Sequence, residues 1–164
     1  MIKAVESLGG NGDSGAVTTD SVADVLEREL DNLIKKWLAA VEKEPSLTHI
    51  PLSYVARTGH LPHLLHEVIR RLRLKAPMRS AISKAAADHG DLRHKQGYTV
   101  AMVVEESRLL QVTIFTTLHI HMKNLDFNTL LPDVVVIADE VDSQLKDQMM
   151  RFMETDSVKK AERE

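Results

Sequence analysis

The spacing of apolar residues is the feature that most constrains the fold of this chain. In residues 22–41, and again in 131–152, apolar side chains recur at steps of three and four residues, which places them on one face of a helix. The same steps in 61–72 predict another helix, with Pro62 in its first turn, where the missing N–H needs no partner. Prolines and glycines separate these segments. We therefore expect an all-α fold.

The expected architecture is a bundle of about five helices with a long central helix and a long C-terminal helix. The predicted helices span residues 21–44, 61–72, 78–86, 91–122 and 129–154. The fourth is predicted to be central because apolar residues fall on almost every face between Tyr98 and Met122. The β-branched residues of 112–114 and 134–137 would also suit buried strands. The length of the periodic segments favours helices.

Composition excludes several classes of protein. The 164 residues include no cysteine, which excludes a disulfide framework, a thiol nucleophile and a cysteine-ligated metal. No apolar run approaches the roughly 18 residues of a membrane span, and no signal peptide is evident, so a cytoplasmic protein is expected. The length predicts one helical domain, 19–154, preceded by a flexible glycine-rich leader, 1–18, and followed by a charged tail, 155–164.

No catalytic motif or metal-binding motif is evident, so neither an enzyme nor a metal site is expected. His66 and Glu67 begin like a zinc-peptidase helix, but Arg70 stands where the second histidine would be. His60, His63 and His66 are predicted to lie on the solvent side of their helix, opposite its leucines.

Two other histidines bear on a haem alternative. His119 and His121 are two residues apart, so on a helix they point in nearly opposite directions and cannot hold one ion. A haem would require a neutral imidazole in an apolar pocket, which His89 or His119 could supply. No cofactor is expected, and haem is the alternative.

A row of polar residues is the most unusual local pattern. His89, Arg93 and Gln96 share one face if the helix continues through Gly90, which could instead be a helix cap. Inside a helical bundle, such a row needs mutual hydrogen bonds or a ligand. Glu106 could reach Arg93 only across a bend or from a neighbouring protomer. The row is therefore either a structural network or a ligand site.

This row carries a resemblance to a known family. The matching positions are His89, Gly90, Arg93, Gln96, Gly97, Tyr98, Val103, Val104, Glu106 and Leu110, with Trp37, Leu61, Pro62, Leu64 and Leu65 upstream. Over residues 20–150, the chain resembles the RsbRD-type N-terminal sensor domain, found ahead of STAS domains in RsbT co-antagonist proteins of the stressosome and ahead of histidine-kinase modules. Ser107 departs from the usual aromatic residue, and Gln111 from a frequent arginine.

The resemblance implies a non-enzymatic, all-helical sensory or regulatory module of bacterial signal transduction. Such a module dimerises and passes a signal to an output kinase or STAS-type domain, in cis or in trans. The candidate ligand-binding or regulatory residues are His89, Arg93, Gln96, Tyr98, Glu106 and His119. The alternative is a helical carrier or sensor that binds a small molecule or haem.

The C-terminal helix and a basic segment are the candidate partner surfaces. Val141, Leu145, Met149 and Phe152 approximate a heptad, which suits either a homodimer or packing on the same bundle. The net charge is −3, yet residues 57–95 hold nine Lys and Arg against three Asp and Glu. Arg70, Arg71 and Arg73 are therefore candidates for an acidic partner or for pairing within the bundle. Nucleic acid is not expected, since no recognition motif is evident.

Overall fold

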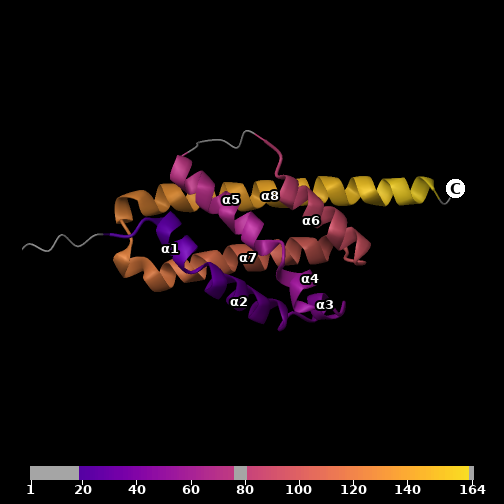
Figure 1. Cartoon of the computed structure of the whole chain (residues 1–164), viewed down its shortest axis with the longest axis horizontal. Helices are drawn as coiled ribbons and strands as arrows, with labels where there is room; N and C mark the ends of the chain where they lie inside the picture. Colours follow the sequence, from indigo (N-terminus) through magenta and orange to yellow (C-terminus); the bar gives the residue numbers. More distant parts are fainter. Residues whose placement is uncertain (1–18, 76–80, 163–164) are drawn as a thin grey trace, which may run out of the picture.

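The fold is all-α, as the apolar spacing predicts. The computed structural model describes residues 19–75 and 81–162, in which no β-strand forms (Figure 1). The elements are α1 (Val22–Arg28), α2 (Leu30–Val41), α3 (Pro45–Thr48), α4 (Tyr54–Thr58), α5 (Leu61–Leu74), α6 (Lys84–Lys95), α7 (Val100–His121), the 3-10 turn η1 (Met122–Asn124) and α8 (Phe127–Ala161). The predicted leader, 1–18, and the predicted helix start at Met78 lie outside the described residues.

The helix predicted for 21–44 is present but is divided in two. Ser21 caps α1: its hydroxyl accepts a hydrogen bond from the Asp24 N–H at 3.1 Å and donates one to the Asp24 carboxylate at 2.6 Å. The helix breaks at Glu29, and α2 continues to Val41. Both halves face the core, where Leu26, Leu33 and Trp37 are buried.

The helix predicted for 91–122 is wrong in its boundaries. Residues 84–95 form α6, which continues through Gly90, and the chain then turns at Gly97 before α7 begins. Gly97 has φ +84, a left-handed conformation that glycine adopts without steric cost. Thr99 caps α7 by accepting a hydrogen bond from the Met102 N–H. The turn separates α6, which packs mainly on α8, from α7.

Helix α7 is less enclosed than predicted. Its inner face is buried, including Val103, Leu110 and Ile114, but Val104 and Val112 are 41% and 48% exposed. Apolar residues therefore lie on both faces of α7, and its outer face is not covered by the other described helices.

Helix α8 is longer than the predicted 129–154. It begins after Asp126, which caps it, includes Pro132 and continues through most of the predicted tail to Ala161. Its C-terminal end extends beyond the other helices (Figure 1). Residues 134–137 and 112–114 are helical, so neither strand alternative holds. Among the described helices, none is long and apolar enough to cross a membrane.

Candidate functional site

The candidate site is centred on Arg93, whose side chain is fully buried between α6, α7 and the α4 region. Its Nε donates a hydrogen bond to Glu106 Oε2 at 2.8 Å. Its Nη atoms donate to the side-chain oxygen of Gln96 and to the backbone carbonyls of Ala56 and Arg57, at 2.7 to 3.0 Å. Each of the three guanidinium nitrogens thus has an acceptor, as a buried charge requires.

Glu106, on α7, accepts hydrogen bonds on both carboxylate oxygens. Tyr98 donates its hydroxyl to Glu106 Oε1 at 2.8 Å, and Arg57 in turn donates to the Tyr98 oxygen at 2.8 Å. The Trp37 indole N–H donates to the backbone carbonyl of Glu106 at 3.1 Å. We call Arg57, Arg93, Gln96, Tyr98 and Glu106 the Arg93 network.

The turn at Gly97 makes this network possible within one chain. Arg93 precedes the turn and Glu106 follows it, so the reversal brings the two charges together. This confirms the bend as the route by which Glu106 reaches Arg93, and a neighbouring protomer is not needed. The predicted row of His89, Arg93 and Gln96 also forms, because α6 stays helical through Gly90.

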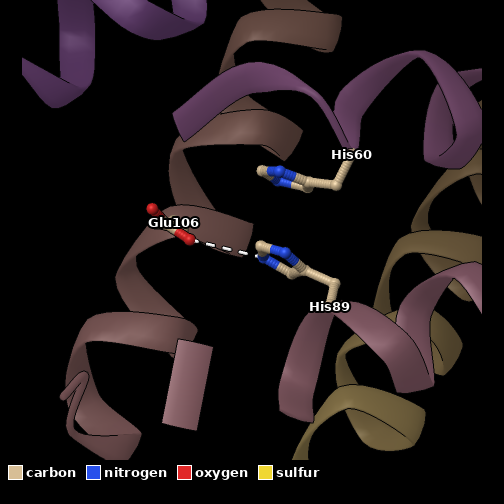
Figure 2. A group of neighbouring side chains, drawn as sticks. All are labelled: His60, His89 and Glu106. Atoms are coloured by element: carbon tan, nitrogen blue, oxygen red, sulfur yellow. Dashed lines mark ion pairs between the residues drawn. The ribbon is translucent and has the colours of Figure 1, made fainter. Parts of the chain in front are cut away.

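A pair of stacked imidazoles adjoins the network (Figure 2). The rings of His60 and His89 lie 3.6 Å apart between centroids and are tilted by 14°. His89 Nε2 lies 3.5 Å from Glu106 Oε2. The Trp37 ring meets His60 edge-on, with 5.9 Å between the ring centroids. The Nδ1 atoms of both histidines are buried and have no hydrogen-bond partner.

The predicted solvent position of His60 is therefore wrong. His60 is the N-cap of α5 and has helical φ −82 and ψ −25, so it lies one turn before buried Leu64, at the edge of the leucine face and not opposite it, and its ring points into the core. His63 and His66 lie within α5 and are exposed, as predicted.

Burial and neighbouring charges shift the pKa values of His60, His89 and Glu106. Desolvation lowers the pKa of His60 well below the usual imidazole value, and the neighbouring His89 and Arg93 lower it further. Desolvation also lowers the pKa of His89, although Glu106 opposes the shift. For Glu106, burial acts to raise the pKa, but His89 and the Arg93 charge outweigh it, so the pKa is lowered. Near neutral pH the site holds two neutral imidazoles and one carboxylate.

A small cavity borders the imidazole pair. It is lined by His60, His89, Glu106 and Trp37, and on the α8 side by Val141 and Gln144. Its volume of ≈ 10 Å³ is close to the minimum for one water molecule. The Gln144 side-chain oxygen, like the two Nδ1 atoms, is buried without a partner.

The structure separates the other predicted site residues from this group. His119 is exposed on α7. Val141 and Phe152 are buried in the chain's own core, with Leu145 and Met149 packed against it, so the α8 stripe is used within the bundle.

The predicted basic residues also differ in their surroundings. Arg70 is exposed. Arg71 is buried and pairs with Asp139 and Glu140, whereas Arg73 pairs with Asp24 and Glu27 at the surface. Arg71 and Arg73 thus neutralise acidic residues of α8 and α1, whereas exposed Arg70 has no ion pair within residues 19–75 and 81–162.

Sequence reasoning missed Arg57 and His60 as members of the site. Neither belongs to the polar row, and Arg57 is one of the nine Lys and Arg residues of 57–95 with no local pattern of its own. The signal available for His60 was its position four residues before Leu64, which places it next to the leucine face of the helix.

The charged groups of the site are engaged with one another. His60, His89 and Glu106 could hold a metal ion, because one ligand atom from each lies within 4.8 Å of the others. No protein family model, no curated protein and no solved structure matches the chain.

Proposed function

We propose that this protein is a non-enzymatic sensory or regulatory domain of bacterial signal transduction. In this proposal the buried site around Arg93 and the imidazole pair receives the signal, and α8 carries it to an output domain or partner. The observation that carries the proposal is the contact between α6 and α8 at Gly90. A Cβ built at Gly90 would lie 2.1 Å from the backbone oxygen of Gln148.

This contact couples the site to α8. Gly90 directly follows His89 and lies one turn before Arg93, and α6 packs more extensively on α8 than on any other helix. Since the two backbones touch, a shift of α6 at the site must move α8 or break the packing. The coupling acts through a two-state change whose populations a ligand shifts by its differential affinity.

The far end of α8 offers a surface for a partner. Beyond buried Phe152, the helix exposes Met153 and Val158 among charged residues. We propose that a second copy of the chain contacts this end, giving a cytoplasmic homodimer. The output would be a kinase or STAS-type domain, in cis or in trans, as the sequence resemblance implies, with exposed Arg70 available to an acidic partner.

A spin-label experiment tests the coupling. Because the chain has no cysteine, Ser157→Cys introduces a single labelling site on the exposed end of α8. In the dimer, Glu106→Gln should shift the distance distribution between the two labels, because it removes the negative charge that Arg93 and His89 face. Glu105→Gln is the matched control, since Glu105 precedes it on α7 and pairs only with Arg108 in the described structure.

Two outcomes would contradict the proposal. One is a folded Glu106→Gln variant, verified by circular dichroism, whose label distances equal those of the Glu105→Gln control. The other is sedimentation of the chain as a monomer at all concentrations, which would exclude the homodimer.

The alternative of a haem-binding or small-molecule carrier draws on the two unpartnered imidazoles. The adjoining cavity, at ≈ 10 Å³, is far below the several hundred Å³ of typical cofactor pockets, so a haem would require the core to open. A Soret band that is lost in His89→Ala would favour this alternative over the cofactor-free proposal.

A further inference from the structure

The unpartnered polar atoms of the core are concentrated around one cavity. Among the described residues, five buried side-chain nitrogen or oxygen atoms lack a hydrogen-bond partner. Three of them, His60 Nδ1, His89 Nδ1 and Gln144 Oε1, belong to residues that line the ≈ 10 Å³ cavity beside Glu106. An unpartnered buried polar atom costs on the order of 1–3 kcal/mol, so this arrangement favours an occupant that supplies the missing partners.

We propose that His60, His89 and Glu106 bind one divalent transition-metal ion of the zinc type. Neutral imidazole and carboxylate are ligands that Zn²⁺ accepts, whereas Mg²⁺ and Ca²⁺ prefer oxygen ligands alone. The three residues come from the start of α5, from α6 and from α7, so the ion would join three elements of the bundle (Figure 2).

The distances require only a small contraction of the site. One ligand atom from each residue lies within 4.8 Å of the others. Two ligands on a tetrahedral zinc ion, each about 2.1 Å from the metal, are about 3.4 Å apart. Side-chain movements of about 1 Å would therefore bring the three atoms to bonding distance.

The ion must also unstack the two imidazoles. The lone pairs of a histidine lie in the plane of its ring, so two nearly parallel rings cannot both direct a lone pair at one ion. Rotation of the His60 ring about its Cβ–Cγ bond corrects this, and that torsion has a broad, shallow preference. Trp37, which meets His60 edge-on, would sense the rotation.

The neighbouring side chains orient the Glu106 carboxylate and affect the affinity for the ion. Arg93 Nε donates to Glu106 Oε2 and Tyr98 donates to Oε1, so the carboxylate that faces the ion is held in position. The positive charge of Arg93 opposes the ion, and affinity should therefore be weaker than in closed structural zinc sites. The Gln144 oxygen or one water would complete the coordination.

Metal titration of the full chain tests the proposal. The chain, freed of any affinity tag and dialysed against EDTA, is titrated with ZnCl₂ by calorimetry, and the fluorescence of Trp37, the single tryptophan, is followed in parallel. One ion per chain should bind and change the Trp37 emission. His60→Phe, which keeps a ring stacked on His89, should lower the affinity at least about tenfold, since even residues that only support a ligand contribute 10- to 100-fold.

The same helix provides the matched controls. His63→Ala and His66→Ala remove exposed imidazoles three and six residues further on, and both should leave the affinity unchanged. Equal affinity of His60→Phe and the unmodified chain would overturn the proposal. An equal loss in the His63 or His66 variants would show surface capture and would also overturn it.

If His60→Phe does not fold, X-ray absorption of the zinc-loaded unmodified chain decides the question. Two imidazole nitrogens at about 2.0 Å are expected, and fewer than two would overturn the proposal. This inference rests on the proposed function, because the ion would be the ligand of the same site. Binding is measured without any output, so its failure leaves the coupling to α8 to be judged by the spin-label distances alone.

Discussion

Two buried arginines illustrate how differently one residue type can be used in the same bundle. Arg93 is fully buried, and its acceptors include Glu106, Gln96 and two backbone carbonyls. Arg71 is also buried, but it pairs with Asp139, whose side chain is 57% exposed, and with Glu140, and its Nε has no partner.

The two arginines differ in where their partners lie: those of Arg93 are in the interior, and one of those of Arg71 is at the solvent-exposed edge of α8. Arg93 holds the α4 region, α6 and α7 together by bonds to backbone as well as side chains, so water cannot replace its partners. Arg71 links α5 to the edge of α8, where water reaches one of the two carboxylates. Loss of Arg93 should therefore cost much more stability than loss of Arg71, although both are charged and buried.

The largest effect is expected for Arg93→Ala. The substitution leaves Glu106 buried without its main counter-charge and exposes two backbone carbonyls to a cavity, so the free energy of unfolding should fall by about 3–5 kcal/mol. Chemical denaturation measures this change. A loss below about 1 kcal/mol would contradict the central role of Arg93.

The second-largest effect is expected from acidification, which should lower the free energy of unfolding through the imidazoles beside Arg93. The pKa values of His60 and His89 are lowered by burial, so below pH 6.5 the unfolded chain binds protons that the folded chain does not. Each imidazole that stays neutral in the fold then costs about 1.4 kcal/mol per pH unit, or about 2 kcal/mol between pH 6.5 and pH 5.

Stability as a function of pH provides the check. The loss sets in as pH falls through the unfolded imidazole value. It precedes the loss from Glu106, whose lowered pKa gives its full stability above the ordinary carboxyl value and loses it as pH falls from there through the folded pKa. His60→Phe should flatten the slope between pH 6.5 and pH 5, whereas exposed His63→Phe should not. Equal slopes in the two variants would show that the imidazole pair is not the titrating group.

Arg71→Ala should have an intermediate effect, a loss of roughly 1–3 kcal/mol. Asp139 can turn to water, and Glu140 keeps the hydrogen bond from Gln144, so less unpaired charge remains buried. Thermal unfolding beside Arg93→Ala measures the ratio. Equal destabilisation of the two variants would contradict the prediction that loss of Arg93 costs more stability than loss of Arg71.

The smallest effect is expected for Arg73→Ala. Arg73 pairs with Asp24 and Glu27, and all three side chains are about half exposed. Solvent-exposed ion pairs contribute about 0–1 kcal/mol, and added salt weakens them further. Denaturation at low and high salt should show a small difference that shrinks with ionic strength, and a loss as large as that of Arg71→Ala would contradict this ranking.

The sequence was sufficient for the helical class and for part of the site. The spacing of His89, Arg93 and Gln96 places them on one face, which the structure confirms. Arg93→Ala could be assigned a loss of only 1–3 kcal/mol from the sequence. The larger value depends on its complete burial and on its ion pair with Glu106, both of which are tertiary facts.

The rest of the site depends on turns that periodicity does not reveal. Residues 93–97 carry no apolar side chain, so periodicity says nothing about the α6–α7 turn, and the helix predicted for 91–122 runs across it. Gly97 followed by Thr99 was the available signal, a left-handed residue and then a helix cap. The predicted solvent position of His60 is wrong for another reason: His60 lies one turn before Leu64, at the edge of the buried face, and the leucine spacing alone does not show how far that face extends. Arg57 has no local pattern, since only tertiary packing brings it to Tyr98.

The backbone hydrogen bond from the Asp20 N–H to the Asn124 carbonyl determines how far apart proteins fused to the two ends of the domain would lie. It fixes the beginning of α1 beside the start of α8, and α8 then runs 35 residues, about 50 Å, to its other end. Fluorescent proteins fused before residue 19 and after residue 162 would be held at opposite ends of a rod. Energy transfer between them should be weak in the folded chain and should report any bending of that rod directly.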